Sequence, residues 1–119
     1  MTEEGVIERE VFNNLLEAVG GDKAFLNELI DTFFQDTPVQ IAAIRQALSL
    51  GNAENFRRAA HSLKSNSANF GAQRLSQQSK ELEELGKAGK LNGADERLAQ
   101  LETEYEKVKI ALESIRREV

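Results

Sequence analysis

Residues 98–115, LAQLETEYEKVKIALESI, carry the apolar pattern that decides the fold. Large apolar side chains recur there in alternating steps of three and four residues, at Leu98, Leu101, Tyr105, Val108, Leu112 and Ile115. Because an α-helix has about 3.6 residues per turn, these side chains form one narrow stripe. A stripe of this kind is typical of a helix that packs at a shallow angle in a bundle. The pattern predicts a helix over about 94–116.

Four apolar stripes upstream predict four more helices, over about 8–19, 23–50, 53–69 and 72–88. The glycines Gly20, Gly21 and Gly51 mark helix ends, because glycine adopts the left-handed conformation that ends a helix. Asp22 and Asn52 follow these glycines and are candidates for the N-caps of the next helices. We therefore expect short connections between the helices.

Two features interrupt this pattern. The second stripe begins at Phe25 and resumes beyond Pro38, which favours one long helix that is bent at the proline. Residues 86–93, GKAGKLNG, contain three glycines and predict the clearest loop of the chain.

The composition agrees with a helical chain. The strong helix formers Ala, Leu, Glu, Gln, Lys and Arg make up 66 of 119 residues, whereas Val, Ile and Thr together number 16. Helices of similar length with short connections pack as antiparallel neighbours. We predict an all-α fold, an up-down-up-down four-helix bundle with a short N-terminal helix across one end. The length fits a single domain over 1–119, with a core of about 8–116.

Composition also excludes several classes of site and partner. With no cysteine and one histidine, the chain can form no disulfide and no zinc site of the usual cysteine and histidine types. A net charge of −5 disfavours nucleic acid and anionic membranes as partners, although residues 37–90 alone carry +4. The chain contains no membrane span, and its first residues do not resemble a signal peptide. We expect a cytoplasmic protein with no metal site of its own.

The only histidine, His61, lies in the middle of the third predicted helix. At about 100° per residue, the core face of that helix contains Phe56, Ala60, Leu63, Ser67 and Phe70. His61 points about 140° away from this direction, toward solvent. The face that it occupies also carries Arg57, Lys64, Ser65 and Ala68. A neutral imidazole is a competent nucleophile near pH 7 and could accept a phosphoryl group, whose oxygens Lys64 could stabilise.

The sequence around His61 resembles a known family. HSLKSNSANFGA begins at His61 and is followed by QRLSQQSKELE. It resembles the histidine-containing phosphotransfer (Hpt) domain, whose pattern is H-x-L-K-G, small residues, an apolar residue, G-A and a later L-E. The matching positions are His61, Leu63, Lys64, Ser67, Phe70, Gly71, Ala72, Leu75, Leu82 and Glu83. The resemblance extends over about 8–112.

This resemblance implies a function. His61 would accept the phosphoryl group through Nε2, and Lys64 would support it, while Leu63, Ser67, Phe70 and Gly71 would be structural positions of the motif. The protein would be a carrier with no ATP site and no kinase activity of its own. It would relay phosphate between response-regulator receiver domains, fed by a hybrid sensor histidine kinase. Mg²⁺ would come from the receiver's acidic pocket, and we expect the carrier to be a monomer.

Partner contacts are also expected on this surface. A receiver would dock over the third and fourth helices, with apolar contacts from the first. We expect Arg57, Ser65, Ala68 and Lys87 to take part, with Lys80 and Glu84 lining the opposite rim. Ser65 departs from the family pattern, which usually has glycine there, and with Asn66 it could alter the phosphohistidine lifetime or the choice of partner.

Two alternatives are left open. The chain could be the phosphotransfer module of a chemotaxis-type kinase, phosphorylated by a separate ATP-binding domain. It could also be a helical adaptor that binds receivers without transferring phosphate. The start at Met1 and the end at Val119 favour an independent protein over a piece of a hybrid kinase.

Overall fold

The computed structural model describes residues 5–118, and every regular element in that range is an α-helix. The helices are α1 (Arg9–Ala18), α2 (Lys23–Leu50), α3 (Ala53–Asn69), α4 (Gln73–Ala88) and α5 (Ala94–Glu118). The predicted all-α fold is confirmed. The domain predicted over 1–119 also includes residues 1–4 and 119, which lie outside the described range. Within 5–118, no helix has the length and the apolar composition needed to cross a membrane.

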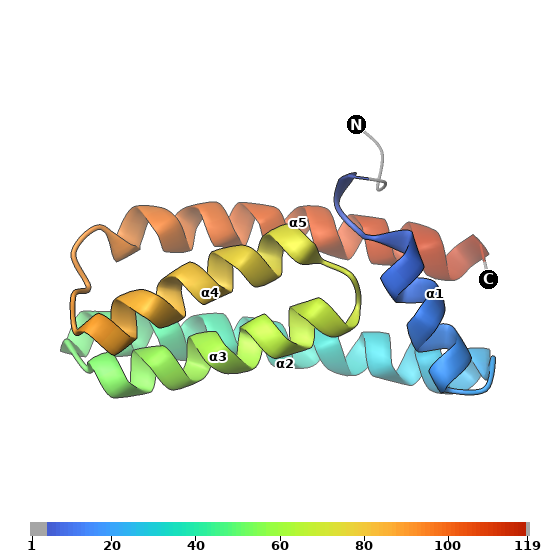
Figure 1. Cartoon of the computed structure of the whole chain (residues 1–119), viewed down its shortest axis with the longest axis horizontal. Coiled ribbons are helices and arrows are strands. Elements are labelled where there is room, and N and C mark those ends of the chain that lie inside the picture. The colour runs from blue at the N-terminus through green and yellow to red at the C-terminus, as the bar shows by residue number, and fades with distance from the viewer. Residues whose placement is uncertain (1–4, 119) are drawn as a thin grey trace.

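Helices α2 to α5 form a four-helix bundle in which each helix runs opposite to the next (Figure 1). Helix α3 packs against α2 and α4, and α5 closes the bundle against α4 and α2. In Figure 1, α3 and α4 face the viewer and α1 crosses one end, beside the start of α2. The predicted up-down-up-down arrangement is therefore correct, and the surface formed by α3 and α4 lies opposite that formed by α2 and α5.

The helix ends follow the predicted capping chemistry. The side chain of Asp22 accepts a hydrogen bond from the backbone N–H of Phe25 at 3.0 Å, and that of Asn52 accepts one from Asn55 at 3.1 Å. Gly51 ends α2 in the left-handed conformation, with φ of 68°. Pro38 lies inside α2, which continues through it as one helix of 28 residues, as predicted. These caps fix where α2 and α3 begin.

The core contains the whole apolar stripe of α5, since all six of its large side chains are buried. One prediction is wrong at the other end of the chain. Phe25, in the first turn of α2, is 46% exposed. Val6 and Ile7, which precede α1, are buried in the core.

Residues 86–88 were predicted both as the end of the fourth helix and as the start of the loop over 86–93, and the loop prediction is wrong for these three residues. Helix α4 continues to Ala88, and Gly89 ends it with φ of 68°. Gly86 lies buried inside the helix, where its lack of a side chain accommodates α3 at Arg57. A glycine that serves close helix packing gives the same sequence signal as a glycine in a loop.

The turn between α3 and α4 holds the segment that precedes α1. The N–H of Glu8 donates a hydrogen bond to the carbonyl oxygen of Gly71 at 2.7 Å. Gly71 has φ of +82°, and a Cβ atom there would lie 2.6 Å from the carbonyl oxygen of Glu8. Both the left-handed backbone and the close approach require glycine at this position.

We expect Gly71→Ala to lower the free energy of unfolding by roughly 2 kcal/mol or more, because it adds a backbone clash to left-handed strain. Urea denaturation measures this loss. Gly20→Ala is the matched control, since Gly20 has φ of +70° but open space around its Cβ position. It should cost only about 1 kcal/mol. Equal losses in the two variants would show that the contact with Glu8 adds nothing.

Candidate functional site

The site is built on the exposed side of α3, halfway along the helix. The side chain of His61 is 54% exposed, and Lys64, almost one turn further on, is 30% exposed. Arg57 lies one turn before His61, where it forms an ion pair with Glu54 at 2.7 Å. The expected exposure of His61 on the helix is therefore observed.

A carboxylate from α4 joins the side chains of His61 and Lys64. Oε2 of Glu83 lies 2.7 Å from Nδ1 of His61, and Oε1 of the same group lies 2.8 Å from Nζ of Lys64. The Glu83 side chain is only 5% exposed. Each carboxylate oxygen thus has its own partner, and the buried charge is fully paired.

The two helices are also joined behind this contact. The hydroxyl of Ser76 donates a hydrogen bond to the backbone carbonyl oxygen of Lys64 at 3.0 Å. This bond joins the beginning of α4 to α3. Gly86 contacts α3 near the end of α4, so Glu83 lies between the two contacts. The position of Glu83 relative to His61 is consequently set by helix packing on both sides.

Glu83 is the residue of the site that sequence reasoning did not single out. It was recognised only as a motif position, while Lys80, Glu84 and Lys87 were expected on the rim of α4. Those three side chains are exposed. A useful signal was present, because Glu83 directly follows the core residue Leu82 and so lies at the edge of the buried stripe.

The hydrogen bond to Glu83 determines which nitrogen of the imidazole carries the proton. An ionised carboxylate can only accept, so Nδ1 of His61 must be the donor. In the neutral ring, Nε2 then carries the free lone pair. The side chain that faces solvent therefore presents an unprotonated nitrogen, held in a fixed orientation by a buried partner.

The electrostatics of the cluster favour this arrangement. The hydrogen bond from Lys64 holds the pKa of Glu83 below its usual value; burial acts in the opposite direction, and the bond with His61 lowers the pKa further. Glu83 is therefore ionised at neutral pH. A folded-state pKa below the unfolded value stabilises the fold above the unfolded pKa, and that contribution is lost as the pH falls through the folded pKa.

We expect Lys64→Met to destabilise the protein by about 1 kcal/mol at pH 7, a value reduced because Lys64 is partly exposed. At pH 3, below the ordinary pKa of a glutamate side chain, part of this contribution is lost, so the difference from wild type should shrink. Urea denaturation at both pH values measures the two differences. Arg97→Met removes a more exposed ion pair, with Glu81, and should cost less at pH 7. A loss for Lys64→Met that is the same at both pH values would contradict the pairing with Glu83.

The remaining predicted positions divide between core and surface. Leu63, Ser67 and Phe70 are buried, and Gly71 forms the turn described above. Ser65 and Lys87 are exposed, while Ala68 and Arg57 are partly exposed. Arg57, Ser65 and Ala68 share α3 with His61, whereas Lys87 lies near the end of α4. The hydrogen bond from Arg57 lowers the pKa of Glu54 to about 2, so the charge of this arginine is already paired.

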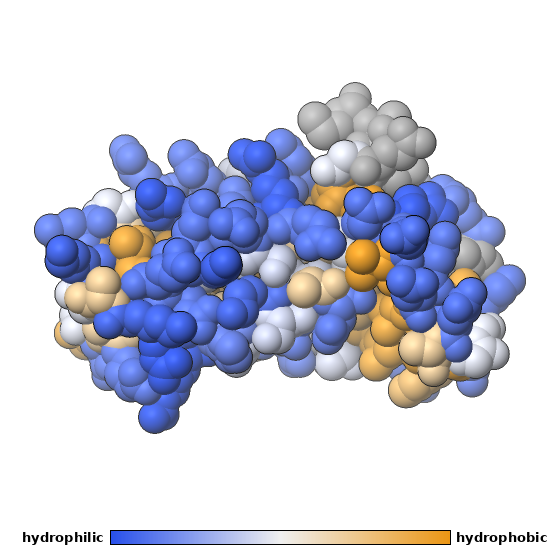
Figure 2. All heavy atoms as spheres, viewed as in Figure 1, coloured by the Kyte–Doolittle hydropathy of each residue, from blue (hydrophilic) through white to orange (hydrophobic). Residues whose placement is uncertain are grey.

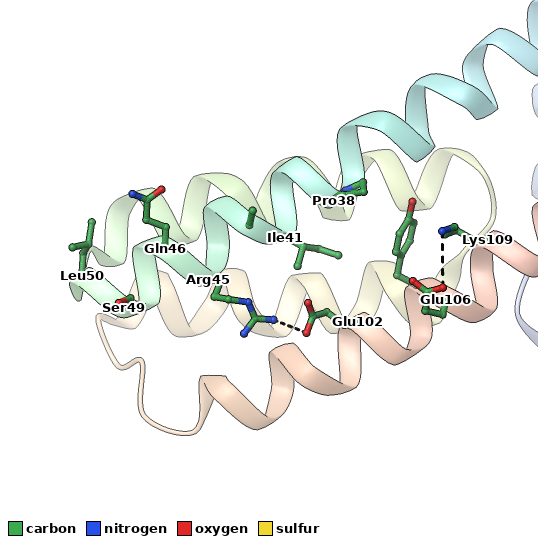
Figure 3. Close-up of a pocket in the computed structure, with 11 residues that line it drawn as sticks. Pro38, Ile41, Arg45, Gln46, Ser49, Leu50, Glu102, Glu106 and Lys109 are labelled. Carbon is green, nitrogen blue, oxygen red and sulfur yellow. Dashed lines mark hydrogen bonds and ion pairs between the residues drawn. The ribbon is translucent and has the colours of Figure 1, made fainter.

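The site is an exposed surface and not a cavity. An open groove of about 640 Å³ lies on the other side of the bundle, between α2 and α5. Figure 3 shows Ile41 and Pro38 of α2 facing α5 across this groove, with an ion pair between Arg45 and Glu102. Within residues 5–118, no three metal-ligating side chains are grouped to hold a metal ion. His61 is open to a partner that approaches from outside the bundle.

Comparisons with known proteins identify the family. The Hpt domain family matches residues 28–111. A crystal structure of histidine-containing phosphotransfer protein B (HptB) from Pseudomonas aeruginosa PAO1 superposes with a TM-score of 0.86 and 32% sequence identity, covering 96% of each chain. The comparison with curated proteins gives no match. Hpt domains work with receiver domains and histidine kinases in phosphorelays. The chain belongs to the Hpt domain family and is a histidine phosphotransfer carrier of two-component phosphorelays.

Proposed function

We propose that Nε2 of His61 accepts the phosphoryl group from the phosphoaspartate of one receiver domain and passes it to the aspartate of another. This proposal rests on one observation, that one side of the imidazole contacts a buried residue while the ring is open to solvent. Nδ1 is held by the buried carboxylate of Glu83, whereas the ring as a whole is 54% exposed. The nucleophilic nitrogen is therefore the one that an incoming protein can reach.

The transfer needs no proton to move. The lone pair of Nε2 attacks phosphorus, the bond from phosphorus to the aspartate oxygen breaks, and its electron pair stays on the aspartate carboxylate. The ring becomes an imidazolium that keeps its proton on Nδ1, next to the negative charge of Glu83. In the onward step an aspartate oxygen attacks phosphorus, and the electron pair of the N–P bond returns to Nε2. The same contact with Glu83 thus serves both directions.

Lys64 can bind either Glu83 or the phosphoryl group on His61. In the unphosphorylated protein its ammonium is bound to Glu83 at 2.8 Å. The side chain is 30% exposed, so a change of rotamer can direct it toward phosphoryl oxygens on the neighbouring His61. We propose that Lys64 neutralises Glu83 before transfer and supports the phosphoryl group afterwards.

The receiver is proposed to dock over α3 and α4 and to reach α1. Apolar surface gathers beside α1 in Figure 2, which views the face formed by α3 and α4. A hollow of about 170 Å³ lies there between Leu15 of α1, Leu29 of α2 and Asn69 of α3. Basic side chains of residues 37–90 complement an acidic receiver pocket, which is also the proposed source of Mg²⁺.

The test is phosphoryl transfer to the full chain from a panel of receiver domains phosphorylated with acetyl phosphate in the presence of Mg²⁺. We expect an acid-labile phosphate on nitrogen, visible by ³¹P NMR and mapped to His61 by mass spectrometry of peptides. Incubation with a chemotaxis-type kinase domain and ATP, without a receiver, tests the alternative donor. Binding of receivers without uptake of phosphate from any source would contradict the proposal and favour an adaptor.

A further inference from the structure

Helix α4 contains a glycine where helix stability favours almost any other residue. Gly86 is buried two residues before the end of the helix. Glycine inside a helix costs about 1 kcal/mol relative to alanine, because it loses more backbone entropy on folding. Unlike the glycines of the turns, Gly86 does not have a positive φ. Its conformation therefore does not explain why a glycine is needed.

Packing supplies the reason. A Cβ atom at position 86 would lie 2.9 Å from Cβ of Arg57 and 3.0 Å from its Cα and its backbone nitrogen. Carbon atoms in contact normally lie about 3.5–4.0 Å apart. The atoms that a side chain would meet belong to the backbone of α3 or are fixed to it, so a rotamer change cannot relieve the contact. A side chain at this position must push the two helices apart.

This close contact lies one turn from the reactive histidine. Arg57 precedes His61 by four residues on α3, and Gly86 follows Glu83 by three residues on α4. The helices are antiparallel, so the contact between Gly86 and Arg57 lies beside the contact between Glu83 and His61 (Figure 1). If the helices separate where Gly86 meets Arg57, they also separate where Glu83 meets His61.

We propose that Gly86 is a positioning residue for phosphoryl transfer, because its missing side chain sets the helix spacing at which Glu83 reaches Nδ1 of His61. The proposal rests on the proposed role of His61 as phosphoryl acceptor. A methyl group at position 86 requires a shift of roughly 0.6 Å or more to reach ordinary contact. Added to the 2.7 Å between Nδ1 and Oε2, such a shift exceeds the upper limit of about 3.2 Å for an N–H···O hydrogen bond.

Glu83 has little freedom to follow the histidine. Its side chain is 5% exposed and belongs to α4, whereas His61 and Lys64 both lie on α3, so both contacts of the carboxylate are stretched when the helices separate. The long, flexible side chain of Lys64 can follow Glu83, whereas the short side chain of His61 cannot, so the hydrogen bond with His61 is the contact that weakens. Once that bond weakens, the imidazole is free to exchange tautomers and to carry its proton on Nε2, where there is then no lone pair for attack on phosphorus.

The first test uses ¹⁵N NMR of the imidazole in the unphosphorylated full chain, at a pH where the ring is neutral. Because His61 is the only histidine, its two nitrogens give the whole signal. Wild type is expected to show one tautomer, protonated on Nδ1, and Gly86→Ala a mixture of both. Glu83→Asp shortens the reach by one methylene without altering Gly86 and should give a similar mixture. A single tautomer in either variant would overturn the proposal.

Gly89→Ala is the matched control for stability. Gly89 has φ of +68° and open space around its Cβ position, so alanine strains the end of α4 without moving α3. It should lower the urea midpoint while keeping the wild-type tautomer and transfer rate. The same tautomer mixture in Gly89→Ala would show that general loosening of α4 is responsible, and would overturn the proposal.

The second test is a double-mutant cycle on the rate of transfer from a phosphorylated receiver. Gly86→Ala should slow transfer by about 3- to 10-fold in the wild-type background, which is less than the effect of misplacing a reacting group by a full 1 Å. In a Glu83→Ala background it should have no further effect, because the residue through which it acts is gone. Additive losses would overturn the proposal.

The two proposals fail in different ways. If His61 were not the acceptor, wild type would take up no phosphate on histidine, yet the tautomer measurements would still decide whether Gly86 sets the contact with Glu83. If only the positioning role were wrong, His61 would be phosphorylated in wild type, and Gly86→Ala would keep the tautomer.

Discussion

Replacing His61 with glutamine is expected to abolish uptake of phosphate from every phosphorylated receiver. Glutamine has no nitrogen with a free lone pair, since its amide nitrogen is a donor only. No second imidazole is present to take over, because His61 is the only histidine of the chain. The fold should persist, since the His61 side chain is 54% exposed and contributes little to the core.

Mass spectrometry of the chain after incubation with a phosphorylated receiver measures this loss. Gln100→Ala, an exposed change on α5, is the control and should take up phosphate at the wild-type rate. Circular dichroism should give the same helix content for both variants. Acid-labile phosphate remaining on the His61→Gln protein would contradict the assignment of the acceptor.

Substitutions of Glu83 are expected to produce the second largest effect. Glu83→Ala removes both the partner of Nδ1 and the negative charge beside the imidazolium, and should slow transfer on the order of 100-fold, as for a reacting group misplaced by about 1 Å. Glu83→Gln keeps an oxygen that can accept from Nδ1–H but removes the charge. Its loss should be smaller, about 10-fold, because orientation survives and stabilisation of the imidazolium does not.

Single-turnover kinetics with a phosphorylated receiver separate these contributions from binding. The affinity for the receiver should change little in either variant, because the Glu83 carboxylate is buried and does not reach the docking surface. Equal losses for Glu83→Ala and Glu83→Gln would show that the acceptor oxygen adds nothing beyond the charge. Wild-type rates in both would show that the hydrogen bond to Nδ1 has no part in the transfer.

Most of the fold could be predicted because the signals are local. The caps at Asp22 and Asn52 and the left-handed glycine at Gly51 depend only on neighbouring residues, and they placed the helix boundaries within one or two residues. The stripe of α5 depends only on helical periodicity. Val6 and Ile7 were missed for the opposite reason, since two apolar residues in a non-helical segment have no period that marks them as core.

The parts of the site that were missed depend on contacts between helices. Periodicity on α3 indicates that His61 is exposed, but only the register between α3 and α4 places Glu83 against its Nδ1. Gly86 was assigned to a loop because a glycine that permits close packing and a glycine that ends a helix look alike in the sequence. The register between two helices depends on how their surfaces pack, so the pattern of a single helix does not reveal it.

The groove between α2 and α5 provides a place to attach a reporter without disturbing the chemistry. It lies across the bundle from His61, and Ser49 at its edge is exposed. The chain contains no cysteine, so Ser49→Cys would introduce a single thiol for a fluorescent dye. Fluorescence anisotropy from this position would follow the arrival and departure of receivers in real time, while the opposite face stayed free to exchange phosphate.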